Sequence, residues 1–172
     1  MDASSKFKNS LPTTPEFLMQ KLNELNIPYE RFEHPPLFTV TEAKEHQDQM
    51  HGMHVKNLFL RDKKKRNFLL VAEQDTEINI KTLYTKIESD RLSFGSPDRL
   101  WQFLGVRPGA VSPLALINDR SNDVTLVFED KLQADHSIYF HPLVNDVTLG
   151  VKLTQLASFF VFTGHEPQFV EL

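Results

Sequence analysis

The chain has 172 residues, a net charge of −4, 40% hydrophobic and 24% charged residues, and no cysteine. This length suits a single domain spanning residues 1–172, with enough chain to bury a sizeable core. The lack of cysteine excludes disulfides, a thiolate nucleophile and cysteine-ligated metals, and the acidic balance argues against a protein coated with nucleic acid.

The first half of the chain predicts a helix, a strand, a second helix and a β-hairpin. "TTPEFLMQKLNELNIP" is typical of a helix, with Thr14 as its N-cap and Pro15 in its first turn. "YERFEH" alternates as a half-buried strand does, and Thr41 could cap a polar helix, "EAKEHQDQM". Two apolar runs flank a charged turn and predict a hairpin, Asn57–Leu60 and Asn67–Ala72.

The second half predicts helices around several further strands. "IKTLYTKIES" has a helical pattern, and "GSPDRLWQFLG" is a clearer helix with Ser96 as cap, Pro97 first and Gly105 as terminator. "LALIN", "DVTLVFED", "SIYFHPL" and "VTLGVKL" are predicted strands, and a last helix runs from Thr154 to about Gly164. We therefore expect a mixed α/β domain, with a central, mostly antiparallel curved sheet flanked by helices.

The hairpin carries two kinds of cation. The turn "RDKKKR" holds Arg61, Lys63, Lys64, Lys65 and Arg66. Such a run ordinarily solvates a hairpin tip and deters edge-to-edge aggregation, and the alternative is a patch that contacts phosphates. Lys56 stands apart at the entry of the first strand. It is either a surface lysine with its ammonium group in water or a fixed cation for a phosphate or a developing oxyanion.

Histidines near the second predicted helix suggest a metal site only weakly. His46, His51 and His54 lie within "EHQDQMHGMH", but Gly52 interrupts the helix that would align them, and no "HExxH" motif is present. We therefore expect no metal and no cofactor.

Two loops are candidate walls of a binding site. In "FHPLVNDVT", His141 ends an apolar strand and Asn145 follows at a turn, which is either an ordinary turn or one side of a small pocket. In "GAVSP", Gly109 allows a ligand to approach the backbone, and exposed N–H groups of such a loop can bind an anion. Neither a Gly-rich phosphate loop nor a GxSxG nucleophile motif occurs.

Three segments together resemble one family. "HVKNLFLRDKKKRNFLLVA", "RLSFGSPDRLWQFLGVRPGAVSPLALIND" and "FHPLVNDVTLGV" follow the order and spacing of the freestanding prolyl-tRNA editing proteins. That YbaK-like family is similar to the editing insertion domain of bacterial prolyl-tRNA synthetases. The resemblance extends from "FEHPPLFTVTEA" to the final helix and is strongest to the ProX type, which deacylates alanine mischarged onto proline tRNA.

The resemblance implies roles for particular residues. The family's essential lysine matches Lys56, and its substrate-pocket histidine matches His141. Asn145 matches the asparagine of the same motif. The family's GxxxP loop, which would bind substrate, matches Gly109, Ala110, Val111, Ser112 and Pro113. The family has "GGH" or similar before the lysine where this chain has "HGMH", so no role is assigned to His51.

The resemblance implies hydrolysis of an aminoacyl-tRNA ester, with the acceptor end of tRNA(Pro) as partner and prolyl-tRNA synthetase as a possible second one. An ester is already activated, so a positioned water and stabilisation of the oxyanion suffice, assisted by a ribose hydroxyl of the substrate. A small pocket would admit alanine and exclude proline. Three alternatives stay open: removal of another small residue such as cysteine or serine, a noncatalytic tRNA- or synthetase-binding module, and a metal-dependent hydrolase.

The sequence shows no sign of export or membrane insertion. The N-terminus "MDASSKFKNSLPTTPEF" lacks the apolar centre of a secretory signal, and no run approaches the roughly 18 apolar residues of a spanning helix. We expect a monomeric cytoplasmic protein without a membrane partner.

Overall fold

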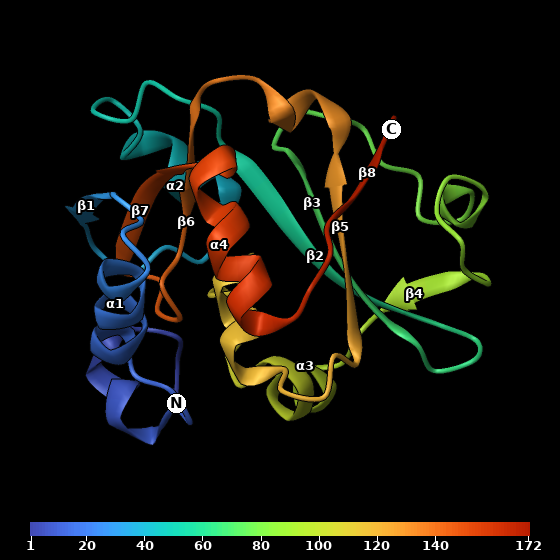
Figure 1. The fold of residues 1–172 in the computed structure, drawn as a ribbon, viewed down its shortest axis with the longest axis horizontal. Coiled ribbons are helices and arrows are strands. Elements are labelled where there is room, and N and C mark those ends of the chain that lie inside the picture. Colours follow the sequence, from blue (N-terminus) through green and yellow to red (C-terminus); the bar gives the residue numbers. More distant parts are fainter.

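The computed structural model describes residues 1–172, apart from the side chain of Val40. Its strands form two sheets (Figure 1). A three-stranded sheet has the order β1 (Glu30–Glu33), β7 (Val147–Lys152), β6 (Ser137–Phe140). A five-stranded sheet has the order β4 (Leu92–Phe94), β2 (Val55–Asp62), β3 (Asn67–Glu73), β5 (Val124–Glu129), β8 (Gln168–Val170).

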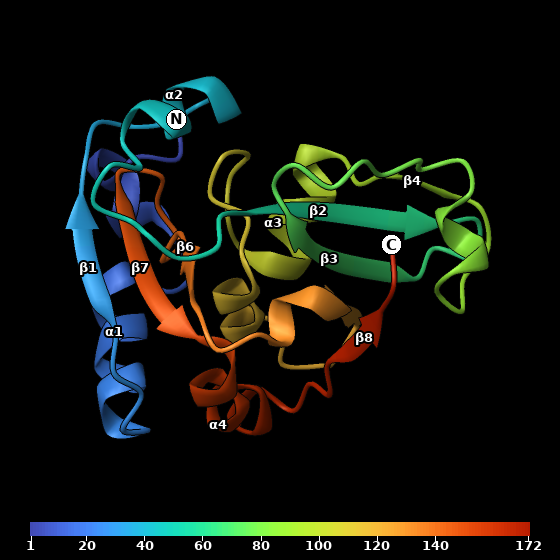
Figure 2. The same ribbon diagram turned by 90° about the horizontal axis from the view of Figure 1, so that it is seen from above.

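The predicted mixed, mostly antiparallel α/β fold is confirmed, with the strands divided between these two sheets. Strand β5 pairs in parallel with β3 and with β8, and every other strand pairing is antiparallel. In Figure 1 the three-stranded sheet lies beside α1, while the β2–β3 hairpin extends to the opposite side of the molecule. The view from above in Figure 2 shows the same separation.

Four α-helices complete the fold: α1 (Pro15–Glu24), α2 (Val40–Glu45), α3 (Pro97–Leu104) and α4 (Leu153–Thr163). The caps expected for α1 and α3 are present. Thr14 Oγ1 accepts from the Phe17 amide, and Ser96 Oγ accepts from the Arg99 amide, each satisfying one of the unpaired donors of the first turn. Short 3-10 helices lie at Ser5–Ser10, Leu83–Thr85, Pro113–Asn118 and Asp130–Gln133.

Helix α2 begins earlier than predicted. Its cap is Thr39, not Thr41, because Thr39 and Glu42 form a reciprocal capping box. Thr39 Oγ1 accepts from the Glu42 amide at 3.1 Å, and the Glu42 carboxylate accepts from the amides of Thr39 and Phe38 at 3.0 and 2.7 Å. Three backbone donors that water would otherwise have to satisfy are therefore paired within this motif.

Two further predicted elements are wrong. The segment "IKTLYTKIES" forms only a single 3-10 turn, because β-branched residues disfavour a helix and its threonines bond locally instead, Thr82 to Asn79 and Thr85 to Thr82. "LALIN" is a 3-10 helix and not a strand, since Pro113 occupies its first turn and the Ser112 hydroxyl caps it.

The main hydrophobic core joins both sheets to α1, α3 and α4. It contains Leu69 and Phe128 of the five-stranded sheet, Leu149 of the three-stranded sheet and Phe159 of α4, all fully buried. The alternate residues Phe68 and Leu70 of β3 belong to a smaller cluster on the other face of the five-stranded sheet, as the two-residue period of a strand requires. Within the described chain, no helix has the length and apolar character to cross a bilayer.

The two sheets meet at the entry of β2. The amide of Met53 donates to the Ser137 carbonyl at 2.8 Å, and Met53 forms an isolated parallel bridge with Ile138 of β6. The start of β2 is thereby held beside the end of the three-stranded sheet. This contact places residues of both sheets around one cavity, described below.

A buried histidine–aspartate hydrogen bond joins the end of α4 to the segment before β5. His165 Nε2 lies 2.7 Å from Asp119 Oδ2, and both side chains are almost fully buried. The Asp119 carboxylate also accepts from the amides of Asp123 and Val124 at 3.0 and 2.9 Å. Since a buried carboxylate must be satisfied by donors, we expect this pair to stabilise the fold.

Substitution His165→Leu leaves the Asp119 carboxylate short of one donor and should lower the free energy of unfolding by about 2 kcal/mol. Urea denaturation followed by circular dichroism measures the change. The exposed His136 provides the matched control, and His136→Leu should unfold as the wild type does. Equal stability of the two variants would contradict a structural role for the pair.

Candidate functional site

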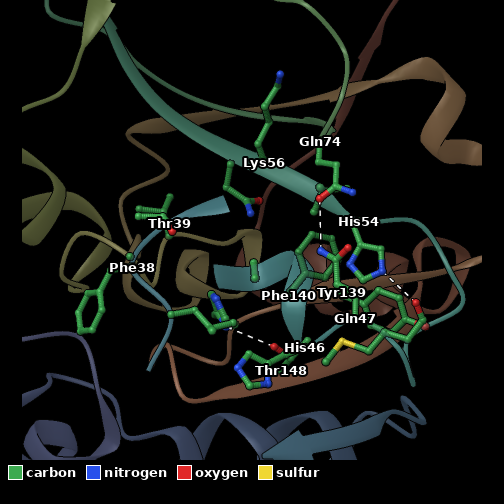
Figure 3. Close-up of a pocket in the computed structure, with 18 of the residues that line it drawn as sticks. Phe38, Thr39, His46, Gln47, His54, Lys56, Gln74, Tyr139, Phe140 and Thr148 are labelled. Carbon is green, nitrogen blue, oxygen red and sulfur yellow. Dashed lines mark hydrogen bonds between the residues drawn. The ribbon is translucent and has the colours of Figure 1, made fainter. Parts of the chain in front are cut away.

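A cavity of about 350 Å³ lies where the two sheets meet. Its walls come from the α2 region, from the start of β2, from the ends of β6 and β3, and from the loop after α3. Figure 3 shows how these side chains lie. The lining residues that matter below are Leu37, Phe38, Thr39, His46, Gln47, His54, Lys56, Asn57, Gln74, Gly109, Val111, Tyr139, His141 and Thr148.

The cavity unites residues predicted from three separate motifs. Lys56, Gly109, Val111 and His141 all line it, although they are far apart in the sequence. Ala110, Ser112 and Pro113 are fully or nearly fully buried behind the loop wall instead. The "GAVSP" loop thus divides into residues that face the cavity and residues that anchor it.

The anchoring of this loop depends on His141. Ser112 Oγ donates to the His141 carbonyl at 2.8 Å and accepts from the Leu114 amide at 3.3 Å. Gly109 has a φ of 97°, which a side chain would strain, and this conformation brings its backbone to the cavity.

His141 is held as a neutral ring of defined tautomer. Its Nδ1–H donates to the Val147 carbonyl at 2.8 Å, because a carbonyl can only accept. Burial lowers the pKa of His141 below its ordinary value of 6.5, since desolvation disfavours the charged imidazolium. Nε2 of the neutral ring is therefore an acceptor at neutral pH.

A second histidine supports this arrangement. The His34 ring is tilted by 53° relative to that of His141, with 5.9 Å between ring centroids, and its Nε2 lies 2.8 Å from the Thr148 hydroxyl. Its Nδ1–H donates to the Pro35 carbonyl at 2.8 Å. Thr148 and His141 both line the cavity, and His34 supports this wall from behind.

Lys56 lines the cavity with its stem, but its ammonium group points elsewhere. In Figure 3 the side chain extends away from His46, Tyr139 and Thr148. The Nζ group donates to the Thr76 carbonyl, and the Thr76 hydroxyl donates to the buried Glu129 carboxylate at 2.9 Å. A substrate in the cavity would reach this cation only after Lys56 rotates about its flexible stem, giving up one hydrogen bond.

Asn145 does not line the cavity but positions its wall. Its side-chain amide donates to the Leu37 carbonyl at 2.9 Å, and its backbone carbonyl accepts from the Leu37 amide at 3.1 Å. Its own amide donates to Ala3 at 2.9 Å, and the next residue, Asp146, accepts from the Ser5 amide at 3.0 Å. The 141–146 turn, residues His141–Asp146, therefore secures both the α2 region and the N-terminal segment.

The basic hairpin tip lies at the other end of β2. Arg61 is about 16 Å along the strand from Lys56. Arg66 is occupied by the buried Asp62, with its Nε 2.8 Å from that carboxylate, and Lys64 lies 3.3 Å from Asp90. The predicted contact of this tip with tRNA phosphates, by Arg61, Lys63, Lys64, Lys65 and Arg66, stays a prediction.

The three histidines of "EHQDQMHGMH" are separated. His46 and His54 line the cavity, whereas His51 is exposed and does not. His54 stacks on Tyr139, with centroids 4.8 Å apart, and its Nε2–H donates to the Met50 carbonyl at 2.9 Å. Among the described residues, no three His, Cys, Asp or Glu side chains are arranged to hold a metal ion.

Several lining residues were not predicted. Phe38, Thr39 and Gln47 belong to the α2 region, and Tyr139 and Thr148 to the three-stranded sheet. The T-x-x-E pattern at Thr39 could have located the first of these groups. No local pattern distinguishes Tyr139 and Thr148 from ordinary strand residues.

Comparison with known proteins identifies related chains. Residues 34–159 match the family model described as "Aminoacyl-tRNA editing domain". The chain is 38% identical over 156 residues to the "Prolyl-tRNA editing protein ProX" of Acetoanaerobium sticklandii, covering 90% of this chain and 95% of that protein. It is 37% identical over 155 residues to the mouse "Prolyl-tRNA synthetase associated domain-containing protein 1", covering 87% of this chain and 91% of that protein.

A solved structure has the same fold. The crystal structure of "a putative trans-editing enzyme for prolyl tRNA synthetase" superposes with a TM-score of 0.65 at 14% identity, covering 93% of this chain and 98% of the other.

The lowered pKa of His141 predicts a pH dependence of stability. The unfolded chain takes up a proton near pH 6.5, whereas the native ring resists it, so the free energy of unfolding should fall as the pH drops from about 7 to 5. His141→Gln should flatten this part of the curve in urea titrations. The exposed His51 is the control: if His51→Gln flattens the curve as much, burial of His141 is not its cause.

Proposed function

Because this chain belongs to the aminoacyl-tRNA editing family, we propose that it hydrolyses the ester of mischarged tRNA(Pro), with alanine as the preferred aminoacyl group. The observation that carries the proposal is the single cavity shared by Lys56, Gly109, Val111 and His141. A cavity of about 350 Å³ lies within the range of small-ligand sites and suits an aminoacyl group with part of its terminal nucleoside.

Hydrolysis requires attack by water on the ester carbonyl and departure of the ribose oxygen. The water adds to the carbonyl carbon, a tetrahedral oxyanion forms, and the C–O bond to the ribose breaks as that oxygen takes up a proton. The described cavity lining contains no cysteine or serine nucleophile, in keeping with direct attack by a positioned water, helped by a ribose hydroxyl of the substrate.

His141 would orient the aminoacyl group. Its neutral ring presents Nε2 as an acceptor, and the α-ammonium group of the aminoacyl ester is a donor. Backbone groups of Gly109 and Val111 would face the carbonyl or the terminal adenosine. Asn145 would act indirectly, by holding Leu37 in the wall.

Lys56 would supply the cation. Its ammonium group would leave Thr76 and turn toward the terminal phosphate–ribose region or the developing oxyanion when substrate binds. Exclusion of proline would follow from overlap with the cavity walls, since a methylene-sized difference in binding alone is worth only about 1–3 kcal/mol.

A noncatalytic tRNA-binding module is the second candidate, and the contact of Lys56 with Thr76 favours it, because the cation does not point into the cavity. It would bind the acceptor end without accelerating ester hydrolysis. Prolyl-tRNA synthetase remains a proposed partner in either case, suggested by the names of the relatives.

Lys56→Ala should reduce the rate of deacylation of Ala-tRNA(Pro) by about 100-fold or more, because one electrostatic contact to the transition state is lost. The release of labelled alanine measures this rate. Lys81→Ala, at an exposed lysine outside the cavity, is the control and should retain the wild-type rate. If Lys56→Ala retains it too, the catalytic role of Lys56 is refuted.

Substrate selectivity is tested with tRNA(Pro) charged separately with alanine, cysteine, serine and proline. We expect the highest kcat/KM for alanine and none above background for proline, because the cavity walls exclude the larger ring. A preference for cysteine or serine would overturn the assignment of alanine. Rates equal to spontaneous hydrolysis for all four would favour the noncatalytic module.

A further inference from the structure

A second hollow adjoins the candidate active site. It is lined by Phe38, Trp101, Arg107 and Pro108 among others. Phe38 lines both hollows, and Pro108 is followed by Gly109, which lines the first. A ligand that extends out of the first cavity past Phe38 would therefore pass directly into the second hollow.

Aromatic side chains are unusually accessible here. Phe38 is 60% exposed and Trp101 is 39% exposed. Helix α3 buries Leu100 and Leu104 in the core, and Trp101, about 100° around the helix from Leu100, lies at the edge of this buried face and is partly exposed. In Figure 3 Phe38 stands at the edge of the cavity, apart from His46 and Tyr139. Neither ring is needed to fill the hydrophobic core.

Arg107 completes the group. Its guanidinium carbon lies 4.9 Å from the centroid of the indole ring of Trp101, a cation–π distance, and one of its N–H groups donates to Ser10 Oγ at 2.8 Å. An aromatic ring beside an arginine plane is the arrangement on which unpaired nucleobases stack.

We propose that Phe38, Trp101 and Arg107 form a stacking platform for the unpaired nucleotides that precede the terminal adenosine of a tRNA 3′ end. The inference rests on the proposed function, because the terminal nucleotide is placed in the first cavity. The preceding base stacks against Phe38, and the next one reaches Trp101. Asp2 and Asp98 line the same hollow and disfavour phosphates, so stacking rather than charge provides the affinity.

A platform of this kind binds single-stranded ends without reading their sequence. Every base has a π-face, so stacking tolerates any nucleotide. In a duplex the bases are paired and stacked on one another, and only the outer face of the terminal pair is free, so Phe38 and Trp101 cannot each receive a base. The platform therefore distinguishes an unpaired 3′ end from a blunt end.

Binding can be followed directly, because Trp101 is the protein's sole tryptophan. We expect its fluorescence to be quenched by an RNA hairpin that carries no aminoacyl group and has a single-stranded ACCA sequence at its 3′ end. The same hairpin with a blunt end should not quench it. No quenching by the first hairpin, or equal quenching by both, overturns the proposal.

Substitutions test the contribution of each ring. Phe38→Ala should weaken binding of the overhang hairpin about tenfold and raise KM for charged tRNA more than it lowers kcat. Phe162, which is 48% exposed on α4, gives the matched control, and Phe162→Ala should bind as the wild type does. Trp101→Leu, measured by anisotropy of a labelled hairpin, should also weaken binding about tenfold. If Phe38→Ala and Trp101→Leu both bind the overhang hairpin with wild-type affinity, the stacking platform is refuted.

The two proposals fail differently. If the overhang hairpin quenches the fluorescence of the wild-type protein but none of the four charged tRNAs is deacylated, the stacking platform is supported and the proposed function is refuted. If the wild-type protein deacylates Ala-tRNA(Pro) but its Trp101 fluorescence does not change on binding, the proposed function is supported and the stacking platform is refuted.

Discussion

The 141–146 turn is the constraint on which the candidate site depends. Its backbone and side-chain groups bond to segments from distant parts of the chain, and among its buried side-chain atoms Asn145 Oδ1 alone has no hydrogen-bond partner. The His141 carbonyl accepts a hydrogen bond from the Ser112 hydroxyl. Asn145 forms two hydrogen bonds with Leu37 and one with Ala3. One short turn thereby sets the positions of the loop after α3, the segment before α2 and the N-terminal residues.

The same turn also sets the chemistry of His141. Its ring is partly buried and donates through Nδ1 to Val147, and desolvation lowers its pKa, so the fold favours the neutral state and selects the tautomer. A neutral histidine in a cavity can accept a hydrogen bond from an ammonium group without adding a charge. The hydrogen bond that fixes the ring to Val147 and the proposed recognition of an aminoacyl group therefore use the two different nitrogens of one side chain.

Charge is distributed in an unexpected way around this site. The conspicuous cations of the hairpin tip lie at the far end of β2, and Arg66 is occupied by the buried Asp62. The solitary Lys56 is at the cavity but turned toward Thr76. The adjoining hollow is lined by the aromatic rings of Phe38 and Trp101 and by a single arginine, Arg107, and not by a basic patch. Recognition of a nucleic-acid end at this edge would then depend on stacking more than on charge.

Local rules were enough for much of the fold. Thr14, Ser96 and Gly105 marked helix ends correctly, because capping depends on residues within one turn. The two apolar runs on either side of a charged turn marked the β2–β3 hairpin for the same reason. Local rules failed where neighbours compete, as at "LALIN", where a proline and a serine cap outweighed an apolar run.

The sequence motifs also identified Lys56, Gly109, Val111 and His141, which line one cavity. The direction of the Lys56 ammonium group, the indirect position of Asn145 and the nearness of Trp101 to Phe38 did not follow from any motif. These features depend on contacts between residues tens of positions apart. Such contacts form only when the two sheets pack together, because the tertiary structure decides which hydrogen-bond partners lie near each buried polar group.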